Sequence, residues 1–150
     1  MNKQHILKHL ELSKPDHIAL IKEAHKLLAG KPQVEIRKPV THMECGYGRW
    51  YFSEGHKLIN IPVLVELELL HQEIHHIYTA LYYITFDRRK KARSTILSGG
   101  VEVPVEEKAF RDKKLKQLEK KVVTMIRLID KVEDKINSMA SNDFNSVWFQ

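Results

Sequence analysis

The sequence predicts an all-α protein that folds as a single domain of residues 1–150. Three stretches repeat apolar residues at intervals of three and four, the spacing that places them on one face of a helix. Glycine and proline residues stand between these stretches and separate the expected helices. A chain of 150 residues with 43% hydrophobic content is long enough for one buried core and too short for two ordinary domains.

The first expected helix runs from Pro15 to about Ala29 and turns His17 toward the core. Proline suits the first turn of a helix, and Gly30 ends the pattern. The apolar positions between them lie on one side of the helix: Leu20, Ile21, Ala24, Leu27 and Leu28. At about 100° per residue, His17 falls at the centre of this stripe. The pattern does not decide whether residues 1–12 extend this helix or form a separate turn.

A loop over residues 31–40 and a short helix over residues 43–52 are expected next. The loop carries two prolines and no helical stripe. The short helix contains Cys45, the only cysteine of the chain, and Thr41 is available to cap it. Two glycines inside this helix, at positions 46 and 48, would each cost about 1 kcal/mol relative to alanine. We therefore expect its backbone to approach a neighbouring segment closely.

A long helix is expected from about Ile61 to roughly Ala92, and its apolar seam contains histidine. The residues of the seam repeat at three and four: Leu64, Leu67, His71, Ile74, Tyr78, Leu81 and Thr85. His71 lies in the seam and His75 lies beside it. A pair of histidines thus replaces hydrophobic residues in the expected core.

The last expected helix covers about residues 104–139 and keeps a heptad repeat. The repeat consists of Leu115, Leu118, Val122, Met125, Ile129, Val132, Ile136 and Met139. Further apolar residues widen the stripe in the middle of the helix: Val123, Ile126 and Leu128. This width predicts packing both on its own core and on a second subunit, in a homodimer. Residues 98–100 break the chain before this helix, and the tail, residues 140–150, is polar with three aromatics.

Charge and hydropathy exclude several classes of function. The net charge of +6 raises nucleic acid as a partner, but the lysines alternate with glutamate at helical spacing and no aromatics are interleaved for stacking on bases. Nucleic-acid binding is therefore not expected. No stretch of apolar residues approaches a length of about 18, which a membrane helix needs. The first residues lack the apolar core and the cleavage site of a signal peptide. We expect a cytoplasmic protein without a membrane partner.

Four side chains are candidates for one metal site: His17, Cys45, His71 and His75. Two histidines at i and i+4 project from one helix face and can bridge one ion, whereas His76 points about 100° away. One thiolate and three imidazoles form a soft to borderline donor set, which predicts zinc as the cofactor. Four protein ligands leave no position for an activated water, so hydrolytic catalysis is disfavoured. The alternative is that the histidines are hydrogen-bonded core residues and the cysteine a small hydrophobe.

The motifs resemble those of the bacterial chemoreceptor zinc-binding domain. That family combines a histidine in the first helix, a Cys-x-hydrophobic-Gly-x-Trp motif and an HxxxH pair. This chain has, in the same order, Asp16-His17, CGYGRWY at Cys45 to Tyr51, and HQEIH at His71 to His75. The resemblance covers residues 13–92 and extends by pattern to the helix that follows.

This resemblance implies an antiparallel four-helix bundle, commonly homodimeric, that binds zinc through the three histidines and the cysteine. Such domains regulate attached chemoreceptors or diguanylate cyclases in response to zinc or to oxidants such as hypochlorous acid. No output domain is evident here, so we expect a stand-alone sensor that signals to a separate partner of this kind.

Three other functions compete with a zinc sensor. A hemerythrin-like bundle that binds iron and oxygen would need further histidines and bridging carboxylates, and no HxxxE or second paired motif appears in the right helices. An adaptor would use the zinc only as a structural staple. An enzyme is not expected: Glu44, Glu54, Glu68 and Glu73 are interpreted as ordinary surface glutamates, and no nucleophile and base are paired.

Overall fold

The structure, a computed structural model, describes residues 2–58, 61–96 and 105–140. Within these residues it contains four α-helices, two short 3-10 turns and no strand. The elements are α1 (Lys3–Leu28), η1 (Gln33–Glu35), α2 (Gly46–Ser53), η2 (Gly55–Lys57), α3 (Pro62–Ile96) and α4 (Val105–Ser138). The all-α prediction is therefore confirmed.

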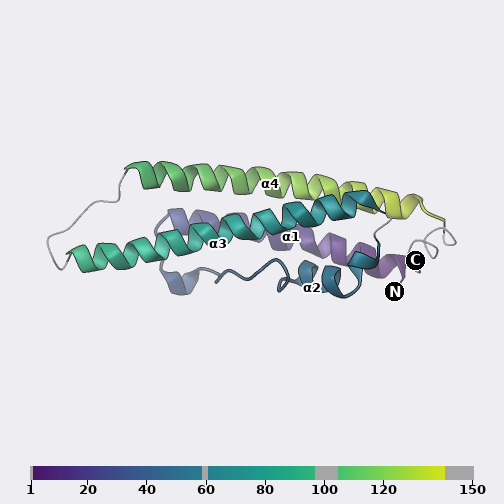
Figure 1. Cartoon of the computed structure of the whole chain (residues 1–150), viewed down its shortest axis with the longest axis horizontal. Helices are drawn as coiled ribbons and strands as arrows, with labels where there is room; N and C mark the ends of the chain where they lie inside the picture. The colour runs from purple at the N-terminus through teal and green to yellow at the C-terminus, as the bar shows by residue number, and fades with distance from the viewer. Residues whose placement is uncertain (1, 59–60, 97–104, 141–150) are drawn as a thin grey trace.

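The three long helices lie side by side, and the segment that contains α2 lies along them (Figure 1). The colours of Figure 1 show that α1 and α3 run in one direction and α4 in the other. The chain between α1 and α3 returns along the molecule, so α2 runs opposite to α1. This return path brings the short helix beside α1 and places Cys45 next to His71, in the first third of α3.

The core is built from the apolar stripes of the three long helices, as their spacing predicted. Every residue of the α3 seam is buried, including His71, which is 0% exposed. In α4 the heptad residues are buried or packed against the core, while Val123 is 46% exposed. The outer part of the widened α4 stripe therefore faces away from this chain's own core.

Helix α1 is longer than the proline pattern predicted, because Pro15 lies inside it rather than in its first turn. The helix begins at Lys3, and the side chain of Asn2 caps it by accepting a hydrogen bond from the His5 backbone N–H at 2.9 Å. Buried Ile6 and Leu10 continue the apolar stripe upstream of the proline. Burial of this stripe offsets the hydrogen bond that proline cannot donate.

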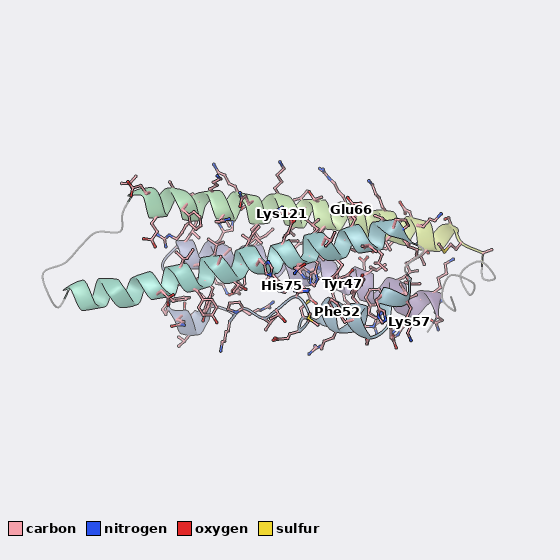
Figure 2. All side chains as sticks on the ribbon, viewed as in Figure 1. Tyr47, Phe52, Lys57, Glu66, His75 and Lys121 are labelled. Atoms are coloured by element: carbon pink, nitrogen blue, oxygen red, sulfur yellow. The ribbon has the colours of Figure 1, made fainter. Side chains whose placement is uncertain are left out.

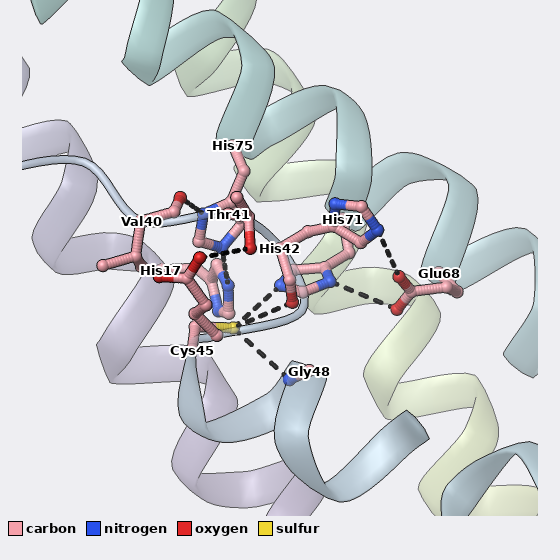
Figure 3. Close-up of polar contacts among 10 residues, drawn as sticks. His17, Val40, Thr41, His42, Cys45, Gly48, Glu68, His71 and His75 are labelled. Carbon is pink, nitrogen blue, oxygen red and sulfur yellow. Dashed lines mark hydrogen bonds and ion pairs between the residues drawn. The ribbon is translucent and has the colours of Figure 1, made fainter. Parts of the chain in front are cut away.

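Helix α2 begins one residue after Cys45, which is its N-cap. The prediction that Thr41 caps this helix is wrong, because the Thr41 hydroxyl donates to the Glu44 carboxylate at 3.1 Å instead. The sulfur of Cys45 accepts a hydrogen bond from the Gly48 backbone N–H at 3.3 Å. Cysteine is an unusual cap, and here its side chain faces α1 and α3 (Figure 3).

Gly48 makes the close backbone approach that the sequence predicted for α2. A Cβ atom at this position would lie 1.7 Å from the carbonyl oxygen of His42. At Gly46, by contrast, the nearest atom to such a Cβ is an Asp16 carboxylate oxygen at 3.8 Å, an ordinary contact. Only the second glycine is required by packing, and it presses α2 against the loop that precedes Cys45.

The remaining boundaries differ from the predictions by a few residues. Helix α3 continues to Ile96, past the expected end near Ala92. The expected break at residues 98–100, the expected start of the last helix at residue 104 and the aromatics of the tail lie outside the described residues. No helix in the described part of the chain is both long enough and apolar enough to cross a membrane.

Replacing Gly48 by alanine should destabilise the protein by about 3 kcal/mol or more, because the new methyl group would overlap the His42 carbonyl and the backbone would have to move. Urea unfolding followed by circular dichroism measures this loss. The matched control is Gly46→Ala, which should change stability by about 1 kcal/mol or less. Equal effects at the two glycines would contradict this description of α2.

Candidate metal centre

Four side chains from three elements meet in the middle of the molecule. His17 comes from α1, Cys45 caps α2, and His71 and His75 come from α3. One donor atom of each lies within 4.8 Å of the donor atoms of the other three. We call these four residues the Cys–His cluster (Figure 3). The structure thus brings together all four residues that the sequence singled out as candidate ligands.

Local helix geometry explains the positions of the three histidines. His71 and His75 are one turn apart on the face of α3 that packs into the core, and their exposed fractions are 0% and 4%. His17 is 2% exposed and continues the buried stripe of α1. The neighbouring His76 is exposed, as its place on the helix predicted. Figure 2 labels His75 on α3 and Tyr47 on α2, and the Tyr47 ring contacts the ring of His71, with centroids 4.8 Å apart.

Carbonyl oxygens fix the tautomers of two of these histidines. The Nδ1 atom of His17 lies 2.7 Å from the Ser13 carbonyl, and that of His75 lies 3.0 Å from the Val40 carbonyl. A carbonyl oxygen only accepts hydrogen bonds, so each neutral ring must carry its proton on Nδ1. The Nε2 atoms of the two rings then present lone pairs to each other at 3.3 Å. A cation between them would satisfy both.

His71 has the same arrangement with a carboxylate as acceptor. Its Nδ1 atom lies 3.2 Å from Glu68 Oε2, and its Nε2 atom lies 3.1 Å from the sulfur of Cys45. A carboxylate behind a histidine orients the ring and raises the basicity of the opposite nitrogen. All three rings therefore direct Nε2 toward the same small volume.

Burial keeps the three imidazoles neutral. Desolvation lowers the pKa of His17 to about 4 and the pKa values of His71 and His75 to about 3. These values include a smaller lowering of the pKa by neighbouring histidines. Neutral imidazole is the form that binds metals, so no proton competes for Nε2 at neutral pH.

The thiol of Cys45 is protonated in the absence of a cation. Burial raises its pKa, and this effect outweighs the backbone N–H groups of Gly48 and Tyr47, which favour the thiolate. The sulfur lies 3.6 Å from the His42 carbonyl, to which the thiol donates. A bound cation would favour the thiolate, so metal binding should release a proton.

The spacing of the donor atoms fits four-coordinate geometry with a small adjustment. Zinc bonds of about 2.05 Å to nitrogen and 2.3 Å to sulfur place tetrahedral ligands about 3.3 Å apart for two nitrogens and about 3.6 Å apart for nitrogen and sulfur. The His17–His75 pair matches at 3.3 Å, and the Cys45–His71 pair is shorter at 3.1 Å. The two donor atoms that lie farthest apart are separated by no more than 4.8 Å. To reach tetrahedral spacing they would approach each other by at most about 1.2 to 1.5 Å.

Two residues that the sequence analysis did not assign to the site border it. Glu68, interpreted there as a surface glutamate, is only 9% exposed, and burial raises its pKa to about 7. Its Oε1 atom has no hydrogen bond and lies 3.7 Å from Nε2 of His42. The helical phase could have placed Glu68, which stands one residue after the buried Leu67. Nothing in the pattern of the loop indicated His42.

A cavity of about 210 Å³ opens beside the cluster. Its wall includes the sulfur-bearing Cys45, the ligand candidates His17 and His75, and the two cationic residues Arg37 and Lys38. Cys45 is partly exposed, in contrast to the three buried histidines. The cysteine is therefore the most exposed member of the Cys–His cluster.

Comparisons of the chain with protein-family models, with curated proteins and with solved structures found no match. The resemblance to the chemoreceptor zinc-binding domain is carried by the three motifs. The site itself is defined by its geometry: four convergent donors, three of them oriented by a hydrogen bond on the far side of the ring.

The metal-free chain should lose stability as the pH falls below about 6.5. Unfolded histidines take up protons near that pH, whereas the folded cluster resists protonation until about pH 4 at His17 and about pH 3 at His71. Between pH 6.5 and these lower pKa values the unfolded state binds more protons than the folded state. The free energy of unfolding therefore decreases as the pH decreases. The slope is up to about 1.4 kcal/mol per pH unit for each histidine.

Urea unfolding in the presence of a chelator at about pH 7, 6 and 5 tests this slope. The variant His71→Gln removes one titrating group and should show a shallower dependence. His76→Gln, at an exposed position of the same helix, is the matched control. A stability that is flat between about pH 6.5 and 4 would contradict the burial of neutral imidazoles.

Proposed function

We propose that this chain is a zinc-binding regulatory protein that holds one Zn²⁺ through His17, Cys45, His71 and His75 in an antiparallel four-helix bundle. The observation that carries the proposal is the pair of Nε2 lone pairs 3.3 Å apart, each fixed by a carbonyl on the far side of its ring. Two buried lone pairs that face each other are unfavourable unless a proton or a metal ion lies between them. The low pKa values of both histidines disfavour the proton.

The donor set favours zinc over iron. One thiolate and three imidazoles suit a d¹⁰ ion without geometric preference, and no carboxylate belongs to the group of four. A hemerythrin-like di-iron centre requires bridging carboxylates. Such a centre would give visible colour, whereas zinc gives none.

A binding role is favoured over catalysis. Four protein ligands complete a tetrahedron and leave no open position for a substrate or an activated water. A zinc ion at this site would join α1, α2 and α3 and keep the sulfur of Cys45 as a thiolate. The arrangement suits a structural or sensory site, and we propose no enzymatic reaction for it.

The position of the sulfur supports a sensory role. Cys45 is the one partly exposed member of the Cys–His cluster, and the cavity beside it carries Arg37 and Lys38. Its thiolate would react with hypochlorous acid to give a sulfenic acid and chloride: sulfur is oxidised, and the chlorine atom takes up the electron pair and leaves. A sulfenic acid is a poor ligand, so the ion and the N-terminal end of α2 would both be released.

We propose that this release is the signal and that a separate partner reads it. The motif resemblance suggests a chemoreceptor or a diguanylate cyclase as that partner, and a homodimer as the assembled state. The exposed face of α4 at Val123 is available for a second copy. A purely structural zinc is the second candidate, because a metal that joins three helices also stabilises them.

Purified protein should contain about one zinc per chain, measured by elemental analysis. His71→Ala and His75→Ala should each reduce the zinc content strongly and lower stability, since structural zinc contributes on the order of 10 kcal/mol in small domains. His76→Ala, on the exposed face of the same helix, should retain full zinc. Comparable losses at all three positions would mean that the cluster is not the metal site.

One equivalent of hypochlorous acid should release the zinc, detected with a chromogenic chelator, and add one oxygen to Cys45, detected by mass spectrometry. The matched control is Cys45→His, which offers four imidazoles and no oxidisable thiolate. Its zinc should survive the same treatment. Release of zinc from this variant at the wild-type rate would rule out oxidation of Cys45 as the trigger.

The same experiment separates a sensor from a staple. If zinc is a sensory ligand, far-ultraviolet circular dichroism should show that the oxidised protein keeps most of its helix, because the core of α1, α3 and α4 remains. Oligomer size, followed by size-exclusion chromatography, should change. Global unfolding on release of zinc would favour the structural role instead.

A further inference from the structure

A second group of metal-binding side chains lies near the N-terminal end of α1, away from the Cys–His cluster. His5 and His9 are one turn apart on this helix, and their Nε2 atoms are 3.1 Å apart. Glu54, the C-cap residue of α2, places its Oε2 atom 3.6 Å from Nε2 of His5. The Nε2 atom of His5 therefore lies within 3.6 Å of a second imidazole nitrogen and of a carboxylate oxygen.

We propose that His5, His9 and Glu54 bind a second divalent transition-metal ion, with Zn²⁺ as the reference ion. Imidazole and carboxylate oxygen are both ligands of zinc, and imidazole also suits Ni²⁺ and Cu²⁺. This site is distinct from the Cys–His cluster and does not depend on the function proposed for it. Because it lacks a thiolate and faces solvent, its affinity is lower and its ion exchanges freely.

The distances fit an ion with open coordination positions. An ion about 2.05 Å from each nitrogen would see the two Nε2 atoms, which are 3.1 Å apart, at an angle of about 98°. The separation of 3.6 Å between His5 and Glu54 corresponds to an angle of about 120° at similar bond lengths. Both angles are compatible with a four- or five-coordinate ion, and water completes the set.

Packing holds the histidine pair in position before an ion arrives. The His9 ring stacks on Trp50, with ring centroids 5.4 Å apart and planes 12° apart. Trp50 is 3% exposed, so it forms a fixed wall of the core. The His5 ring meets the His9 ring edge-on, with centroids 4.6 Å apart. Little side-chain freedom remains to be lost on binding, which favours affinity.

An ordinary ion pair between His5 and Glu54 is the simpler explanation, and the chain contains one for comparison. His25 and Glu119 form such a pair at 2.9 Å, with side chains that are 58% and 41% exposed. The corresponding exposures of His5 and Glu54 are 47% and 43%. The N-terminal group differs from this pair because it has a second imidazole nitrogen, Nε2 of His9, at 3.1 Å from Nε2 of His5. Two nitrogens at this spacing are a chelate, whereas one is not.

The two sites are linked through α2. This eight-residue helix has Cys45 at its N-cap and Glu54 at its C-cap, and each cap residue meets histidines of α1 or α3. An ion at the second site would tie the far end of α2 to the first two turns of α1. Occupancy of the exchangeable site would thus fix the helix that supplies the cysteine of the buried site.

Equilibrium dialysis of the full chain against Zn²⁺ tests the proposal. Wild type should bind one exchangeable ion in addition to any ion that survives prior dialysis against buffer. His5→Gln and His9→Gln should each weaken the exchangeable site at least about tenfold and leave the retained ion unchanged. His25→Gln, which removes the comparison pair, should leave both unchanged.

A second readout uses the contact between His9 and Trp50. In a Trp148→Phe background, Ni²⁺ should quench the fluorescence of Trp50, and His5→Gln should abolish this quenching. His5→Gln and His9→Gln alter side chains that are not buried, and circular dichroism verifies that each variant remains folded. An unchanged exchangeable site in His5→Gln and His9→Gln, or an equal loss in His25→Gln, would overturn the proposal. The retained ion is scored separately, so failure of the zinc function and failure of this site are distinguishable.

Discussion

The hydrogen bonds from two histidines to backbone carbonyls determine what the centre of this molecule can do. Ser13 and Val40 each occupy the Nδ1 side of a ring, and the lone pairs of His17 and His75 are thereby turned toward each other. A histidine buried in a core commonly satisfies both nitrogens with protein groups. Here the Nε2 atoms converge, and the donor atoms of Cys45 and His71 lie within 4.8 Å of them, an arrangement compatible with a metal site.

The short helix α2 connects the Cys–His cluster to the rest of the fold. Its capping residue is the cysteine, and its only tightly packed glycine presses it against the loop at His42. The three histidines belong to long helices whose cores extend well beyond the site. Cys45 caps a helix of only eight residues, which the buried Tyr47 and Trp50 hold to the core. A change at the sulfur should therefore act first on the N-terminal end of α2 and only then on the long helices.

The electrostatic environment of the Cys–His cluster makes Cys45 the candidate ligand whose protonation state would change on metal binding. The histidines are neutral and shielded, so among the four candidate ligands the thiolate of Cys45 is the charge that would form on metal binding. Glu68 lies behind His71, and burial raises its pKa to about 7. A cation in the cluster would favour the ionised form of this carboxylate as well. The Cys45 thiol and the Glu68 carboxyl would thus offset the charge of a divalent ion bound in the cluster.

Helical phase determined which residues enter the core. The spacing of three and four placed His71 in the α3 seam, His17 in the α1 stripe and His76 outside, and each lies where the period requires. Such positions depend on geometry that repeats every 3.6 residues and needs no knowledge of the neighbouring helix. The role of Cys45 as a helix cap, the depth of Glu68 and the place of His42 depend on how the chain returns between α1 and α3. The same holds for Pro15, whose missing hydrogen bond is tolerated because Ile6 and Leu10 are buried on α1. The sequence alone therefore determined the helices and their inward faces, and only tertiary packing decided which atoms meet, because loop paths and contacts between distant segments follow no local period.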